Sequence, residues 1–150
     1  MDISSNYIED VSSLSFLPKE CEVWCYNNPV IDWKPLQHIN ALNSDVPGIE
    51  VNATFNTETN PIMATAIASS PFDIEWIGVT WSPADDEEFE EWLYFESMNV
   101  IMLEVPQRPP GTYSLYLSAK DANNRIIGCT ASSADSNEVK WKMFEFEITR

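Results

Sequence analysis

The stretch Ile49-Glu50-Val51-Asn52-Ala53-Thr54-Phe55-Asn56 decides the fold class, because its apolar and polar side chains alternate. Side chains on a β-strand point to opposite faces in turn, so this period of two predicts a strand with one buried and one solvated face. A helix would instead repeat its apolar residues at about every three to four positions. Residues 49–56 are therefore expected to form a strand.

Segments of the same kind lie on both sides of this strand. Tyr113, Leu115, Leu117 and Ala119 alternate with polar or aromatic residues directly after a Pro-Pro-Gly turn. Turn signals recur roughly every 8–12 residues, which predicts an all-β antiparallel β-sandwich of about nine short strands, of the Greek-key or jelly-roll type. Further strands are expected at residues 21–26, 62–69, 74–81, 99–105, 125–130 (as the hairpin partner of 113–119) and 139–149.

Three segments do not fit the strand pattern. Residues 1–18 are polar and Ser-rich, and we expect an N-terminal arm there, followed by a single sandwich domain over 19–150. Residues 29–48 contain three prolines and predict a long connection. Near 83–95 a short helix competes with a strand, because Ser82 suits a helix N-cap and acidic residues follow it.

The chain has six tryptophans, which is many for 150 residues. Trp24, Trp76 and Trp141 lie within apolar strand patterns, so we expect them in the core. Trp33, Trp81 and Trp92 lie near loops or segment ends, where an exposed ring would stack on a sugar or anchor a protein interface. Burial in the core is nevertheless the favoured interpretation for each of them.

Charge is distributed very unevenly along the chain. Residues 1–104 contain 19 acidic residues against Lys19 and Lys34, a balance of −17, whereas residues 105–150 contain five acids and six bases, a balance of +1. The total of −16 repels nucleic acid and anionic lipid and attracts basic proteins. Direct nucleic-acid binding and membrane binding are therefore disfavoured, and a basic protein partner is favoured.

Cysteine usage and the N-terminal sequence indicate a cytoplasmic protein. No secretory signal pattern and no apolar window of membrane-spanning length is visible, and the three cysteines are an odd number. Cys21, Cys25, Cys129 and His38 are ligand types for zinc, but two cysteines four residues apart on a strand are separated by about 13 Å. We therefore expect neither a metal nor a cofactor.

Known catalytic patterns are absent from the sequence. It has a single histidine, His38, in a proline-flanked segment, and it contains neither a Gly-x-Ser-x-Gly motif nor a glycine-rich phosphate loop. Carboxylate pairs of the glycosidase type stay open, but 24 acidic residues make any chosen pair uninformative. These observations favour a non-enzymatic protein.

An acidic segment flanked by tryptophans is the predicted partner-binding site. Its residues are Trp81, Asp85, Asp86, Glu87, Glu88, Glu90, Glu91 and Trp92. The leading hypothesis is an acidic protein-binding module, including an inhibitor or immunity-type protein that occupies a basic surface of its partner. Two alternatives remain: a carbohydrate- or small-ligand-binding sandwich that uses loop tryptophans, and a structural or self-assembling protein that forms homo-oligomers. A purely solvated acidic face is the competing explanation for the segment.

Overall fold

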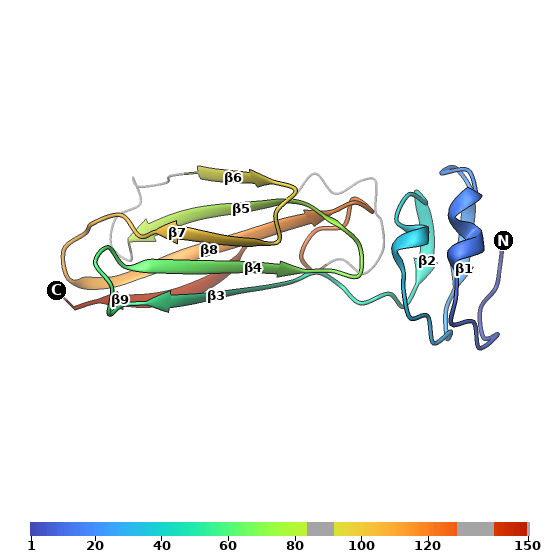
Figure 1. Ribbon diagram of the computed structural model, residues 1–150, viewed down its shortest axis with the longest axis horizontal. Helices are drawn as coiled ribbons and strands as arrows, with labels where there is room; N and C mark the ends of the chain where they lie inside the picture. The colour runs from blue at the N-terminus through green and yellow to red at the C-terminus, as the bar shows by residue number, and fades with distance from the viewer. Residues whose placement is uncertain (84–91, 129–139, 150) are drawn as a thin grey trace.

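The computed structural model describes residues 1–83, 92–128 and 140–149. Over these residues the chain forms nine β-strands and two short 3-10 helices, arranged as an elongated molecule with two lobes (Figure 1). The described residues from 49 onward form the larger lobe, which we call the sandwich. Residues 1–48 form the smaller one, the N-terminal lobe.

Two antiparallel sheets face each other in the described part of the sandwich, with strand orders β3–β4–β7 and β6–β5–β8–β9. The prediction of an all-β antiparallel β-sandwich is confirmed. The strands are β3 (Glu50–Asn56), β4 (Met63–Ser69), β5 (Ile74–Pro83), β6 (Trp92–Glu96), β7 (Val100–Glu104), β8 (Gly111–Asp121) and β9 (Lys142–Ile148).

The connections between these strands are of the Greek-key type. The chain passes from the β3–β4 hairpin to β5 and β6 in the other sheet, returns to β7 beside β4, and ends with β8 and β9. This is the strand order of an immunoglobulin-type sandwich in which the fourth strand has joined the opposite sheet. Tyr113 makes the corner typical of such folds: its hydroxyl donates to the carbonyl of Pro109, 2.6 Å away, at the start of β8.

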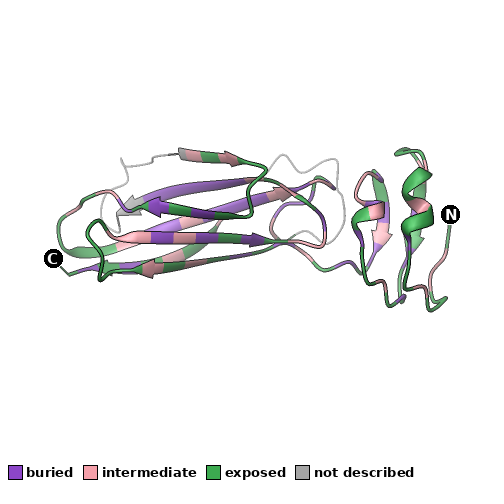
Figure 2. Ribbon diagram, in the orientation of Figure 1, coloured by how far each residue is buried: buried purple, intermediate pink, exposed green. Residues whose placement is uncertain are grey.

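The core lies between the two sheets, as the alternation predicts. On β5 the inward side chains are Ile77, Val79 and Trp81, and on β8 they include Leu115 and Leu117. Figure 2 shows that buried residues run along both of these strands. Ile49 and Val51 are buried, whereas Ala53 and Phe55, farther along β3, are partly buried against the same core. The single wet face expected for residues 49–56 and the inward phase expected for 113–119 are both confirmed.

The expectation of a helix near 83–95 is wrong at both ends of that segment. β5 continues through Pro83, and β6 begins at Trp92 and pairs with β5 in the register Thr80↔Trp92. Residues 84–91 lie outside the described part of the chain. Pairing with β5 satisfies the backbone of residues 92–96 and packs Leu93 and Phe95 against the core, which outweighs local helix signals.

The hairpin predicted for residues 125–130 is also wrong in the described part of that segment. Beyond the turn that follows β8, pairing is limited to one isolated bridge, Lys120↔Ile126, and the strand beside β8 is β9. The chain leaves the sheet here because Arg125 turns inward and bonds to the carboxylate of Asp121.

The N-terminal lobe has its own apolar core, so residues 1–18 are not a separate arm. It contains η1 (Ser12–Phe16), β1 (Glu22–Cys25), η2 (Lys34–Leu36) and β2 (Ala41–Ser44), with β1 and β2 parallel. Residues 29–48 therefore hold a helical turn and a strand instead of a plain connection. The buried side chains of this core are Val11, Val23, Cys25, Trp33, Leu36, Ile39, Leu42, Val46 and Phe72.

A sequence repeat explains the form of this lobe. Asn6-x-Ile8-x-Asp10-Val11-x-x-Leu14-x-x-Leu17 recurs 22 positions later as Asn28-x-Val30-x-Asp32-Trp33-x-x-Leu36-x-x-Ile39. Each unit contributes a 3-10 turn and leads to a strand, and the two strands pair in parallel. Asn28 fastens the two turns, because its Oδ1 accepts from the backbone N–H groups of Asn6 and Ile8, and its Nδ2 donates to the carbonyl of Ile3.

Buried polar contacts join the two lobes. The Nδ2 of Asn123 donates to the carbonyls of Gln37 and Ile39, both at 2.9 Å, and the Nη1 of Arg125 donates to the carbonyl of Pro47 at 2.8 Å. Phe72, from the β4–β5 connection of the sandwich, is buried in the core of the N-terminal lobe. We call these contacts the joint.

Candidate binding site on the four-stranded sheet

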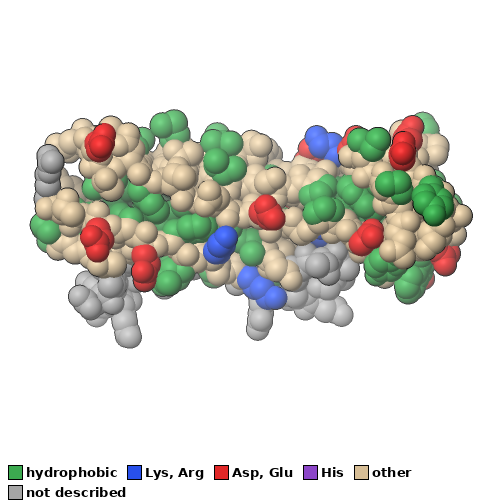
Figure 3. All heavy atoms as spheres, turned by 90° about the horizontal axis from the view of Figure 1, so that it is seen from below, with side chains coloured by type: hydrophobic (Ala, Val, Ile, Leu, Met, Phe, Trp, Pro, Cys, Tyr) green, Lys and Arg blue, Asp and Glu red, His purple; other side chains and the backbone are tan. Residues whose placement is uncertain are grey.

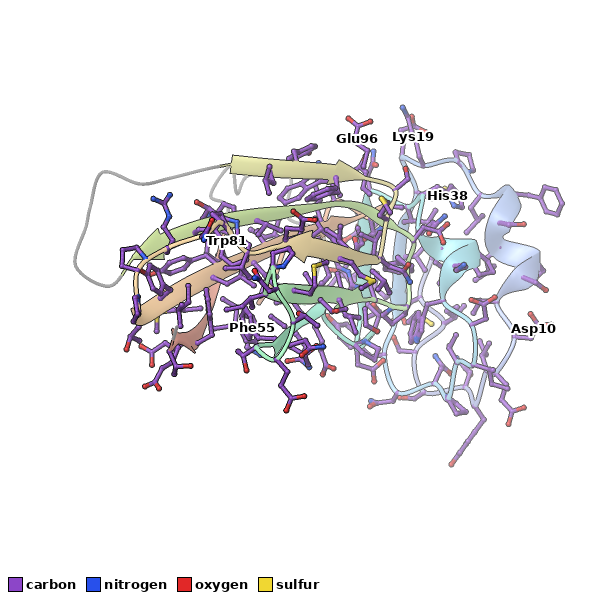
Figure 4. All side chains as sticks on the ribbon, turned by 60° about the vertical axis from the view of Figure 1, so that its left-hand side comes forward. Asp10, Lys19, His38, Phe55, Trp81 and Glu96 are labelled. Atoms are coloured by element: carbon purple, nitrogen blue, oxygen red, sulfur yellow. The ribbon has the colours of Figure 1, made fainter. Side chains whose placement is uncertain are left out.

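The structure removes Trp81 from the predicted site and leaves most of that site untested. Trp81 is only 5% exposed, and its indole packs edge-on against Phe146 between the two sheets (Figure 4). It therefore does not contribute to an exposed aromatic-acidic surface. Trp92 opens β6 in register with Thr80. The acidic part of the prediction, residues 85–91, lies outside the described residues, and it comprises Asp85, Asp86, Glu87, Glu88, Glu90 and Glu91.

Burial of Trp33 and Trp81 confirms the favoured interpretation for these two residues. Trp24, by contrast, is 42% exposed. Trp76 and Trp141 are only half-buried. The expected core positions of Trp24, Trp76 and Trp141 are thus corrected.

Strand phase explains why Trp76 lies on the outer face, and the sequence contains this pattern. Trp76 alternates with the inward residues Ile77 and Val79, so its side chain must point to the outer face of β5. A register shift between Ile74 and Trp76 obscures the pattern, because it lets two apolar residues near the start of β5 point to different faces.

The outer face of the β6–β5–β8–β9 sheet is rich in aromatic side chains, and we call it the aromatic face. Opposite Trp76 and Gly78 on β5, the register places Glu96 and Tyr94 on β6. The indole of Trp141 lies over Gly78, since a Cβ built there would approach Trp141 Cη2 to 3.2 Å. The remaining outward residues of β8 and β9 include Tyr116, Ser118, Lys120 and Met143.

One end of the aromatic face forms a pocket of about 390 Å³, which we call the Trp76 pocket. The indole of Trp76 and the ring of Tyr94 form its apolar part, with centroids 5.3 Å apart and planes tilted by 35°. Tyr94 is 59% exposed. The complete lining is Glu75, Trp76, Tyr94, Glu96, Ser97 and Lys120.

Backbone contacts hold the rim of the Trp76 pocket in place. The N–H of Ser97 donates to the carbonyl of Glu75 at 2.8 Å, at the point where the chain leaves β6. Ser97 adopts a positive φ of 54°, which turns the chain sharply toward β7. The pocket is therefore built on paired strands and one tight turn.

The charge of the pocket is negative. Lys120 Nζ lies 3.5 Å from Glu75 Oε2, so this carboxylate is partly neutralised. Glu96 has no ion-pair partner among residues 1–83, 92–128 and 140–149, and its side chain points away from the sandwich in Figure 4. The pKa of Tyr94 is raised, first by desolvation and then by the negative charges of Glu96 and Glu75.

Two electron-rich rings beside carboxylates suit a cationic group. A guanidinium or ammonium is attracted to the face of an aromatic ring by the ring quadrupole, and it donates hydrogen bonds to nearby carboxylates. The same rings also suit the apolar face of a sugar, with Lys120, Ser97 and the carboxylates as hydrogen-bonding groups.

Other candidate chemistry occupies structural positions. The Nε2–H of His38 donates to the carbonyl of Leu17 at 2.8 Å, which fixes its ring within the N-terminal lobe. Cys25 is buried, and desolvation raises the pKa of its thiol. Over the described residues, no group of three or more His, Cys, Asp or Glu side chains is placed to hold a metal ion. Within the same residues, no helix has the length and apolar character needed to cross a membrane.

Comparison with known proteins adds no relative to this description. Neither a scan against protein-family models nor a search of curated proteins finds a match to the chain.

Proposed function

We propose that this protein is a non-enzymatic binding module that captures a cationic segment of a partner protein in the Trp76 pocket. The observation that carries the proposal is the Trp76–Tyr94 ring pair beside the carboxylates of Glu75 and Glu96. The function class is the one expected from the sequence, an acidic module for a basic protein partner. The proposed contact with the partner lies on the aromatic face and does not include Trp81.

The energetics of the pocket fit a specific but modest contact. A cation over an aromatic ring contributes about 0.5–2 kcal/mol, depending on how far it is desolvated. An exposed ion pair with Glu96 adds roughly 0.2–1 kcal/mol. Affinity beyond this range would require additional contacts on the partner.

The charge of the whole chain supports a basic partner. A net charge of −16 accelerates the approach of cations from a distance, and salt weakens this effect within a Debye length of about 10 Å at 0.1 M. In Figure 3, acidic side chains are spread along both lobes. The six acidic residues of the segment 85–91 add to this charge, and their role in contact remains a prediction.

Carbohydrate binding is the second candidate, and a specific observation favours it. The half-buried Trp76 and the exposed Tyr94 form a platform beside hydrogen-bonding groups, as saccharide sites require. The sequence pattern suggested loop tryptophans for this role, of which Trp33 and Trp81 are buried. In this second candidate, Trp76 on β5 and Tyr94 on β6 take the role of stacking on the sugar.

Calorimetric titration with an arginine-containing peptide tests the proposal. We expect binding that weakens steeply between about 20 mM and 300 mM salt. Tyr94→Ala should weaken it about 2- to 30-fold, the equivalent of one cation–π contact. Glu96→Gln removes one exposed carboxylate from the pocket. Its matched control is Glu104→Gln, which removes one exposed carboxylate from the other sheet.

Equal effects of the two glutamine variants would refute a role for the pocket and leave only non-specific attraction by net charge. For the second candidate, the same protein is titrated with neutral oligosaccharides. Binding that is insensitive to salt but lost in Tyr94→Ala would favour a saccharide ligand over a cationic segment, because no ionic contact is involved.

A further inference from the structure

The N-terminal lobe carries a second exposed aromatic pair, far from the Trp76 pocket in the chain. Trp24 is 42% exposed and Tyr26 is 37% exposed, and their ring centroids are 6.3 Å apart with planes tilted by 54°. Both side chains lie on the outward side of β1, because Val23 and Cys25 take the inward positions. We call this outward side of the parallel sheet the Trp24 face.

Hydrogen-bonded strands arrange the Trp24 face in rows. Asp2 bridges to Trp24 on one side, and Asn43 lies in register on the other, so one row is Asp2–Trp24–Asn43. Beyond this row, the N–H of Ser5 donates to the carbonyl of Tyr26 at 2.8 Å, and Asp45 directly follows Ser44, the last residue of β2. Each ring thus has a carboxylate on a neighbouring segment.

Contacts within the lobe hold these polar groups in place before any ligand arrives. The N–H of Tyr26 donates to Ser4 Oγ at 3.1 Å, and the N–H of Asn27 donates to Asp45 Oδ2 at 3.1 Å. The N–H of Ser4 donates to Asp2 Oδ1 at 3.0 Å, and this bond lowers the pKa of Asp2. The carboxylate of Asp2 is thus held in its ionised form, and hydrogen bonds to backbone N–H groups orient the carboxylates of Asp2 and Asp45.

The charge of the Trp24 face selects its partner. Its ionisable groups include the carboxylates of Asp2, Glu22 and Asp45 and the ammonium of Met1, which donates to the carbonyl of Glu22 at 2.7 Å. The carboxylates outnumber this cation, and Lys34 in the same lobe is paired with Asp73 of the sandwich at 2.9 Å. A neutral apolar partner would cover Trp24 and Tyr26 but would leave these carboxylates beside an apolar surface, at a cost in desolvation. A cationic side chain satisfies both requirements.

Strand geometry also sets the spacing of the cations. Trp24 lies on β1 and Tyr26 is the first residue after it, so an extended backbone places their Cα atoms about 6.6 Å apart. An extended peptide that runs along β1 presents side chains at the same interval on one side. Arginine or lysine at alternate positions therefore brings one cation to each ring.

We propose that the Trp24 face is a second docking surface, which binds an extended segment of a partner protein with basic residues at alternate positions. This surface is independent of the Trp76 pocket, because the two share no residue. It extends recognition to the N-terminal lobe.

The test uses the full chain and two peptides of equal composition, one with arginines at alternate positions and one with the same arginines adjacent. Calorimetry should give tighter binding of the alternating peptide. Trp24→Ala should weaken that binding about tenfold, and Trp24→Phe should retain part of it, because phenylalanine keeps a weaker cation–π contact. Indole N–H resonances report directly which tryptophan is perturbed.

Tyr7→Ala is the matched control, because Tyr7 is 89% exposed in the same lobe but lies outside the Trp24 face. It should leave the affinity unchanged. Equal affinity for both peptides, or equal losses in Trp24→Ala and Tyr7→Ala, would overturn the proposal. Loss of binding in Tyr94→Ala but not in Trp24→Ala would also overturn it, while supporting the Trp76 pocket. An unchanged urea midpoint in Trp24→Ala checks that the variant is folded.

Discussion

Replacing Arg125 by methionine removes the buried charge at the joint and tests how the two lobes are held together. Arg125 is 1% exposed, and its Nε and Nη2 each lie 2.9 Å from Asp121 Oδ2. Its Nη2 also donates to Ser70 Oγ at 3.0 Å, and its guanidinium carbon lies 4.7 Å from the centre of the Phe72 ring. Methionine has similar length but provides none of these contacts.

The expected loss of stability is large. Removing one partner of a buried ion pair costs about 3–5 kcal/mol, because the remaining carboxylate of Asp121 is left without its counter-ion. That is a large fraction of the roughly 5–15 kcal/mol by which a domain is stable. At about 2–4 °C per kcal/mol for a chain of this size, the melting temperature should fall by roughly 6–20 °C.

Urea denaturation followed by tryptophan fluorescence measures this loss, with Lys34→Met as the control. Lys34 also bonds across the joint, at 2.9 Å from Asp73, but both side chains are 56% exposed. An exposed pair contributes only about 0–1 kcal/mol, so Lys34→Met should have little effect. Similar losses in the two variants would refute the argument that the buried pair beside the joint stabilises the fold more than the exposed pair does.

A double variant separates lost charge from lost packing. In Arg125→Met with Asp121→Asn, no uncompensated charge remains. The introduced amide keeps an oxygen that can accept from the backbone N–H of Asn123, as the carboxylate of Asp121 does at 3.0 Å. We expect recovery of at least about 1 kcal/mol relative to Arg125→Met alone. A further loss of stability in the double variant would mean that lost packing, and not the unpaired charge of Asp121, causes most of the destabilisation.

Three further predictions concern the sandwich and its contact with the N-terminal lobe. Gly78→Val should destabilise the chain by about 1–3 kcal/mol in urea denaturation, because a Cβ at this position crowds the indole of Trp141. Tyr113→Phe should cost about 0.5–1.5 kcal/mol in the same assay, since it removes the hydroxyl of the corner before β8. The pKa of Asp73 is lowered by its bond to Lys34, so this ion pair stabilises the fold above the unfolded pKa of the carboxyl and is lost as pH falls through the folded pKa. Asp73→Asn should therefore flatten the loss of stability in acid below about pH 4, by a small amount because the pair is exposed; an unchanged acid slope would contradict this assignment.

Strand periodicity predicts the sandwich well, because apolar and polar residues alternate along a strand that has one buried and one exposed face. Ile49 and Val51 on β3, and Leu115 and Leu117 on β8, lie in the core as the pattern requires. The same rule was harder to apply to β5, where the register shift near Trp76 disguised the phase. The sequence pattern therefore predicts Trp76 in the core, whereas its side chain lies on the outer face of the sheet.

The N-terminal lobe was missed for a different reason. Its strands are four residues each, too short for alternation to stand out, and its evidence is a 22-residue repeat that only a self-comparison detects. The joint was equally hidden, because Asn123 and Arg125 resemble ordinary turn residues until tertiary structure buries them. The partners of such residues are distant in sequence, as with Asn123 and Ile39.

The joint bonds to main-chain carbonyls of the N-terminal lobe, at Gln37, Ile39 and Pro47. Because every residue type offers such a carbonyl, substitutions at these three positions leave the acceptors in place, and the angle between the lobes tolerates sequence drift. These contacts also set the span between the two proposed docking surfaces. For a partner that reaches both, avidity would then depend on the length of its own linker, rising where the linker matches that span and vanishing where it falls short.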